Sequence, residues 1–118
     1  MSLILTDIPN ISYKREDHGL LSGSYTIDVS EAFWHTLTVN GALSLSFSGF
    51  PDVGNDVIRV LLAITNAGTN LTLAGAVYHY LDETAPTYTV AGVDILGVYS
   101  VDGGNNLYVF PGLNVGTP

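Results

Sequence analysis

A period-two alternation of apolar and polar residues constrains this chain more than any other feature of its sequence. It runs through segments 25–29, 33–39 and 43–48, where aliphatic and aromatic side chains alternate mainly with Thr, Ser or Asp. This period is typical of half-buried strands. Short apolar runs separated by turn residues continue to residue 110. The pattern predicts an all-β fold, an antiparallel β-sandwich or jelly roll of about eight or nine short strands.

The dipeptide Asn40-Gly41 lies between two of these segments and is a strong hairpin signal. A two-residue loop pairs Leu37 with Ser44 and mixes the two faces. A three-residue loop over 39–41 pairs Leu37 with Leu43, which keeps apolar partners on one face, as burial requires. We therefore predict a three-residue hairpin with Gly41 in a left-handed conformation.

Segment 57–64 is apolar on both faces except at Arg59. Such a run predicts a strand covered on both sides, and a short buried helix is the competing interpretation. We expect further strands at 71–73, 77–81, 87–90, 93–101 and 107–110, with a turn over 102–106.

Residues 1–22 differ from the rest of the chain. They contain Lys14 and Arg15, two of the 3 basic residues, and Pro9 and Gly19 interrupt any long element. We expect an extended N-terminal arm over 1–22, followed by one β-sandwich domain over 23–118. An ordinary first strand with a loop is the alternative interpretation of the arm.

The amino-acid composition excludes some classes of function. The chain has 118 residues, no cysteine, and 11 acidic against 3 basic residues, a net charge of -8. Nucleic-acid binding needs clustered Lys and Arg, so we exclude it. The uncharged run 60–81 is long enough for a membrane span, but turn residues at 65–70 interrupt it, and we expect no membrane insertion. The hydrophobic share of 47% and the mean hydropathy of +0.33 predict a subunit interface.

The residues that carry chemistry do not form a recognisable catalytic motif. His18, His35 and His79 are scattered, and His35 falls on an apolar face, which favours a hydrogen-bonded or interface histidine over a catalytic base. Segment 102–106 is rich in oxygen ligands but lacks the closing Glu of a calcium loop. We expect a non-enzymatic protein with no cofactor and no metal.

Two groups of residues are candidates for partner binding. Tyr78, His79, Tyr80 and Tyr88 lie near the loop over 81–86, and aromatic side chains beside a loop grip sugar or protein surfaces. Their alternative role is as ordinary strand aromatics. Lys14 and Arg15 are suited to docking on an acidic protein surface, and a solvated charge pair is the alternative.

Several short motifs follow one another in an order that resembles a known family. They are Ile27-Asp28-Val29, Leu37 to Gly41, Leu43 to Pro51, Val60-Leu61-Leu62, Ala85 to Thr89, Gly92 to Leu96, Tyr99 to Gly104 and Leu107 to Phe110. This succession, over about residues 25–113, resembles a β domain of bacteriophage tail-fibre and related virion proteins. The chain departs from the family at Leu73-Ala74-Gly75, where members often carry a Thr-Trp-Pro motif.

The resemblance implies a homotrimer on the exterior of a phage virion. Family members usually form one module of a long fibre, and little precedes the domain in this sequence. We therefore expect a capsid decoration (cement) protein that stabilises the shell and contacts the major capsid protein or other virion proteins. The alternative is a receptor-binding tip of a tail fibre or spike, which recognises a host surface glycan.

Overall fold

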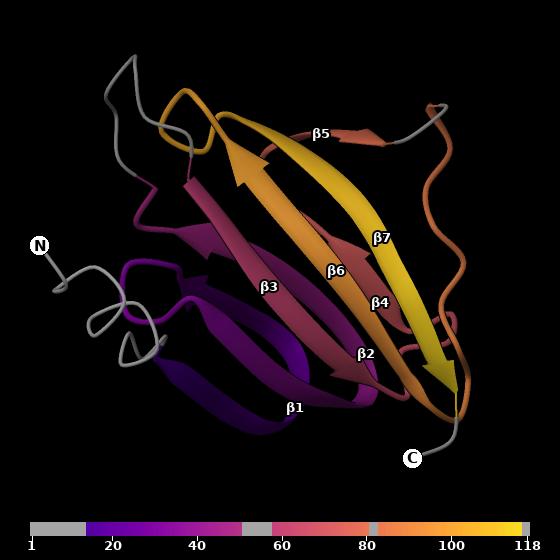
Figure 1. Ribbon diagram of the computed structural model, residues 1–118. Coiled ribbons are helices and arrows are strands. Elements are labelled where there is room, and N and C mark those ends of the chain that lie inside the picture. Colours follow the sequence, from indigo (N-terminus) through magenta and orange to yellow (C-terminus); the bar gives the residue numbers. More distant parts are fainter. Residues whose placement is uncertain (1–13, 51–57, 81–82, 117–118) are drawn as a thin grey trace, which may run out of the picture.

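The computed structural model describes residues 14–50, 58–80 and 83–116, and strands make up most of them (Figure 1). The seven strands are β1 (Arg15–Asp28), β2 (Trp34–Ser48), β3 (Ile58–Thr65), β4 (Leu71–Leu73), β5 (Val77–Tyr80), β6 (Val93–Ser100) and β7 (Asn106–Gly116). The all-β prediction is therefore confirmed. No segment within these ranges is a helix of the length and apolarity that a bilayer span needs.

All seven strands belong to one mixed sheet. Its order is β1-β2-β3-β6-β7-β5, and β4 pairs with β2 beside this path. The expected antiparallel pairing holds for β3–β6 and β6–β7. The pairs β1–β2, β2–β3, β2–β4 and β5–β7 are parallel, so the finer expectation of an antiparallel sandwich or jelly roll is not confirmed.

Strands β1 and β2 are consecutive in the chain and yet parallel, which is possible because both bend. A straight strand of 14 residues would be about 46 Å long, and the five-residue connection 29–33 spans at most about 18 Å. Gly19 and Gly23 in β1 and Gly41 in β2 adopt positive φ values of 71°, 76° and 104°, and the β1–β2 register shifts beside them. Each strand therefore runs outward and returns, and its end lies close to its start (Figure 1).

The predicted hairpin does not form. Leu37 and Leu43 belong to the same strand, β2, in which Leu37 pairs with Ile64 and Leu43 pairs with Leu71. The expected positive φ of Gly41 is present, but it serves a bend. The alternation of apolar and polar residues determines which side chains face the core. It does not determine which strand supplies the backbone hydrogen bonds, and in this fold β1, β3 and β4 supply them to β2.

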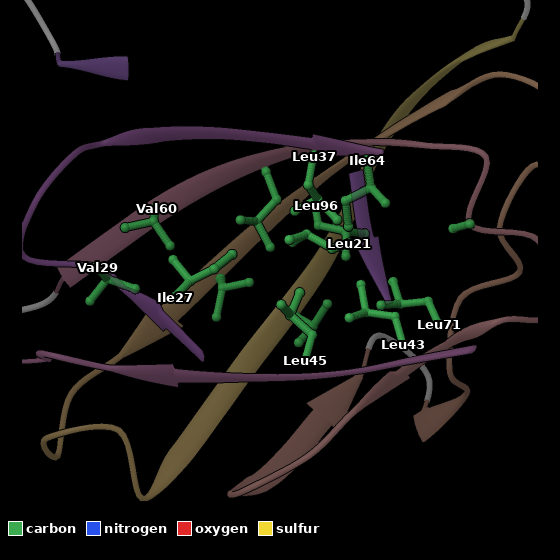
Figure 2. Packing of buried hydrophobic residues seen from close by; sticks show 14 of the residues in the cluster. Leu21, Ile27, Val29, Leu37, Leu43, Leu45, Val60, Ile64, Leu71 and Leu96 are labelled. Atoms are coloured by element: carbon green, nitrogen blue, oxygen red, sulfur yellow. The ribbon is translucent and has the colours of Figure 1, made fainter. Parts of the chain in front are cut away.

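The core lies between the two arms of these bent strands and the inner face of β3, β6 and β7 (Figure 2). Its fully buried side chains come from every long strand: Ile27, Leu37, Leu43, Leu45, Val60, Leu62, Ile64, Leu96, Val98, Leu107 and Val109. Strand β3 confirms the strand predicted for 57–64, and it lies between β2 and β6 as a central strand.

Some segments differ from the expectation. Residues 87–90 are irregular and form no strand, whereas the turn over 102–106 is present. Residues 1–13 of the expected arm lie outside the described residues. From Arg15 onward the chain belongs to β1 and pairs with β2, so the described part of that segment is an edge strand of the sheet.

Candidate binding surface

The outer face of the sheet carries a row of large side chains that cross four strands. In the strand register His79 pairs with Tyr108, Tyr108 with Tyr99, and Tyr99 with Arg59, so the row runs across β5, β7, β6 and β3. Because side chains alternate along a strand, these residues lie on the face opposite the core. The sheet register alone therefore brings residues from 59 to 108 together.

Ring contacts connect this row to two further aromatic residues. The ring of His79 stacks on Tyr108 with centroids 4.9 Å apart, and Tyr99 contacts Phe110 edge-on at 5.2 Å. The Arg59 guanidinium lies 5.2 Å from the Phe33 ring centroid and 5.8 Å from that of Tyr99. We call Phe33, Arg59, His79, Tyr99, Tyr108 and Phe110 the outer aromatic face. Tyr108 and Phe110 remain 39% and 45% exposed.

This face is almost free of acidic groups in a strongly acidic protein. Strands β3, β6 and β7 contain a single carboxylate, Asp94, and it is buried on the inner face. There its oxygens accept hydrogen bonds from the Thr89 backbone N–H at 2.6 Å and from the Thr89 hydroxyl at 3.0 Å. The negative charge of the chain is therefore carried elsewhere, and the outer aromatic face presents rings and one guanidinium.

The predicted tyrosines lie on the opposite side of β5 from His79. Tyr78 and Tyr80 pack against the core, and their rings stack with centroids 6.5 Å apart. The Tyr78 hydroxyl donates a hydrogen bond of 2.6 Å to the Ala74 carbonyl oxygen. Burial raises the pKa of Tyr78 to about 12 and also raises the pKa of Tyr88. These phenols are therefore neutral hydrogen-bond donors at physiological pH.

Two grooves meet at Tyr80. One, of about 530 Å³, is lined by Tyr80, Tyr88, Pro86 and residues of β4, and the other, of about 550 Å³, is lined by Tyr78, His79, Tyr80, Glu83 and Tyr108. Of the four aromatic residues predicted for partner binding, Tyr78, His79 and Tyr80 line one groove and Tyr88 lines the other, and Tyr80 is common to both.

The predicted basic pair lies elsewhere, at the start of β1. The Lys14 carbonyl oxygen accepts hydrogen bonds from the backbone N–H groups of Phe33 and Trp34, and Arg15 pairs with Trp34 in the register. Lys14 and Arg59 line a shallow depression of about 320 Å³ beside the connection 29–33. All 3 basic residues of the chain therefore lie around one end of the sheet.

The structure also assembles a polar cluster that the sequence analysis did not predict. His18 Nε2 lies 2.9 Å from His35 Nδ1, and Glu16 Oε1 lies 3.4 Å and 3.5 Å from these two atoms. His35 is buried and also bonds the Ala32 carbonyl oxygen, as expected for a hydrogen-bonded histidine. Burial lowers the pKa of His35. The available signal was the Glu16-x-His18 spacing, which places both side chains on one face of a strand.

Comparison of the whole chain with known proteins gives no relative: no protein-family model matches it, and neither a curated protein nor a solved structure matches it.

Proposed function

We propose that this chain is a non-enzymatic structural subunit of a phage particle, a capsid decoration protein that assembles as a homotrimer on the virion exterior. The observation that carries the proposal is the outer aromatic face, an exposed apolar surface on a chain with 47% hydrophobic residues. Aromatic side chains and Arg are enriched at the centres of protein interfaces. The phage assignment rests on the resemblance of residues 25–113 to virion β domains.

Charge distribution favours other copies of this chain as the partner on that face. Copies that each carry a net charge of -8 repel one another wherever carboxylates meet. On β3, β6 and β7 the single carboxylate, Asp94, is buried, so these strands bring no exposed carboxylate to the contact, and the nearest ones are Glu31 beside Phe33 and Glu83 beside His79. In a closed trimer with three-fold symmetry, the same contact through this face forms between each pair of neighbouring subunits.

The basic end of the sheet is suited to the capsid contact. Lys14 and Arg59 are exposed and line one depression together with Glu31, and Arg15 is the exposed residue that follows Lys14, so the basic residues of an otherwise acidic subunit lie at one end. An acidic shell surface would attract this end and repel the remainder, which sets the orientation of docking. Three copies in a trimer would present three such ends at once, so weak contacts reinforce one another.

The histidines are compatible with a structural role, because each is held by hydrogen bonds to other groups of the fold. His35 bonds Ala32 and His18, His18 bonds Tyr25, and His79 bonds the Asn106 side chain at 3.0 Å.

The trimer is tested by sedimentation velocity on Phe110→Glu, which places a carboxylate at a 45% exposed position of the outer aromatic face. We expect a trimer for the wild type and a folded monomer for the variant. Leu20→Glu is the matched control, because Leu20 is 68% exposed at the bend of β1 and remote in sequence from this face. A monomeric wild type, or a trimer that survives Phe110→Glu, would overturn the proposal.

Position on the particle is tested by protein copy number in purified virions. Decoration places copies over the whole shell surface, whereas fibres occupy only a few positions on the particle, so decoration gives much the higher copy number. A low copy number would favour the alternative, a receptor-binding tip.

The specific support for that alternative is the groove of about 530 Å³ beside Tyr80 and Tyr88, which has the size of a small-ligand site. Under the alternative, Tyr88→Ala removes binding to host surface oligosaccharides and leaves the oligomeric state unchanged.

A further inference from the structure

We propose that Glu16, His18 and His35 bind a divalent transition-metal ion, with zinc as the first candidate. One ligand atom of each residue, Glu16 Oε1, His18 Nε2 and His35 Nδ1, lies within 4.8 Å of the other two. Two imidazoles and a carboxylate form a donor set that Zn²⁺ takes in proteins. The site is separate from the outer aromatic face, because these side chains lie on the inner side of the sheet.

The distances between these atoms match a tetrahedral site closely. Zinc bonds of 2.0–2.1 Å place neighbouring ligand atoms about 3.3 Å apart. The two distances from Glu16 Oε1 are 3.4 Å to His18 Nε2 and 3.5 Å to His35 Nδ1. The distance between the two nitrogens is 2.9 Å, so they need to separate by only about 0.4 Å.

The strand register explains why the three side chains meet. Glu16 and His18 are two residues apart on β1, and Glu16 pairs directly with His35 on β2. Alternation therefore directs all three toward the core side of two adjacent strands. Glu16 and His35 are direct partners in the ladder, whereas His18 lies at the register shift between Asp17 and Leu20, beside Gly19 with its φ of 71°.

Both imidazoles are already held by outer hydrogen bonds of the kind that orient metal ligands. His35 Nε2 donates to the Ala32 carbonyl oxygen at 2.9 Å, so Nδ1 of the neutral ring carries the lone pair, which accepts the hydrogen bond from His18 Nε2 in the metal-free protein. His18 Nε2 is the donor to His35 Nδ1, so metal binding requires the other tautomer of His18, in which Nδ1 carries the proton and donates to the Tyr25 hydroxyl oxygen 2.9 Å away. The two imidazole planes are inclined by only 12°.

Burial and charge also favour a cation here. The His35 and His18 side chains are 0% and 5% exposed, whereas Glu16 is 43% exposed, so an ion enters and a water reaches it from the Glu16 side. Within the described ranges the ionic partners of Glu16 are these two imidazoles alone. A divalent ion supplies the positive charge that this partly buried carboxylate otherwise lacks.

The test uses full-length, tag-free protein treated with a chelator and then titrated with ZnCl₂ by calorimetry, with CoCl₂ as an optical probe of ligand geometry. We expect one ion per chain, intense visible cobalt absorption typical of tetrahedral coordination, and a rise in Tm with added zinc. Glu16→Gln and His18→Gln should each weaken zinc affinity at least about tenfold. The control is His79→Gln, which alters the third histidine of the chain and should bind zinc like the wild type.

Glu16 is partly exposed, so Glu16→Gln should retain the circular dichroism spectrum and metal-free Tm of the wild type. This separates loss of a ligand from loss of folding. The proposal is overturned if the wild type binds no zinc, if Glu16→Gln and His18→Gln both bind it unchanged, or if His79→Gln abolishes binding.

Discussion

The two halves of the sheet start from the same alternating sequence pattern and pair in different ways. In the half formed by β1, β2 and β4, strands are parallel and the two long ones bend. In the half formed by β3, β6 and β7, the long strands are joined antiparallel (Figure 1). The two halves also differ in their glycines: Gly19, Gly23 and Gly41 have positive φ within β1 and β2, whereas Gly97 of β6 has none. Bends, more than alternation, determine the pairing.

Polar groups inside the two halves also have different roles. In the bent half Glu16, His18 and His35 connect one strand to the next. In the antiparallel half Asp94 anchors an irregular segment by bonding Thr89. Buried polar groups in the first half thus reinforce the sheet itself, and in the second half they fix a loop on it.

Core truncation gives the largest expected effect and tests whether the halves fold together. Leu45 in the bent half and Leu62 in the antiparallel half are both 0% exposed in one continuous cluster. Leu45→Ala and Leu62→Ala should each lower the free energy of unfolding by about 2–5 kcal/mol. Urea unfolding followed by both fluorescence and circular dichroism should give one shared transition for each variant. Separate transitions would show that the two halves are independent units.

Glycine substitution tests the bent half alone. Gly49 has a φ of 86°, and a Cβ there would clash with the Asp28 carboxylate, which accepts two hydrogen bonds from Ser30. Gly49→Ala should therefore destabilise the protein by about 2–3 kcal/mol. Gly23→Ala is the matched control, since a Cβ at Gly23 meets nothing within 4 Å and only the strain of about 1–2 kcal/mol remains. Thermal unfolding should rank the two variants in this order, and equal Tm values would remove the role assigned to Asp28.

Acid titration compares a turn in each half. Hydrogen bonds from the Asn106 side chain and backbone lower the pKa of Asp102, and bonds from Ser30 lower the pKa of Asp28. Each folded pKa lies below the ordinary 3.8, so each contribution to stability is complete above that value and disappears as pH falls through the folded pKa. Asp102→Asn and Asp28→Asn should each be less stable than the wild type at neutral pH, and this difference should shrink in acid. A difference independent of pH would contradict the assignment.

Tyrosine ionisation gives the smallest expected effect. Burial raises the pKa of Tyr78 to about 12, so its neutral form is favoured in the folded protein. The corresponding stability is complete below the ordinary pKa of 10 and is lost as pH rises through about 12. Absorbance at the phenolate band should show that Tyr78→Phe removes one late-titrating group. If the removed group titrates near 10, Tyr78 is more solvated than its contacts indicate.

Much of the strand content follows from the sequence, because burial of one face imposes period two wherever a strand forms. The ranges expected near 57–64, 71–73 and 77–81 correspond to β3, β4 and β5. The parallel partners could not be predicted, because Leu37 and Leu43 satisfy the same burial pattern with either set of neighbours. Residues 87–90 have the sequence pattern of a strand, yet Thr89 is bonded to Asp94, so its backbone N–H does not join a ladder.

The candidate sites were predicted where the residues are close in sequence and missed where register brings them together. Tyr78, His79 and Tyr80 share one short strand, so the sequence alone places them together. Arg59, Tyr99 and Phe110 meet only through the order β3-β6-β7, which a local pattern does not contain. Glu16 and His18 were missed because their segment was expected to be an arm, where a spacing of two has no meaning.

The bends in β1 and β2 also bear on how such a chain changes in length. Each bent strand with its connection forms one circuit of the chain. After a circuit, the next strand begins beside the start of the previous one, at the usual strand spacing of about 4.8 Å. A whole circuit inserted between β1 and β2 would pair in parallel with both of them. The neighbours of β6 and β7 in the sheet would stay the same. A whole circuit inserted between β6 and β7 would instead come between two strands that are paired antiparallel through the turn over 101–105. The side of the sheet formed by β1 and β2 can therefore be lengthened by repeated circuits, whereas the side formed by β6 and β7 contains no circuit to repeat.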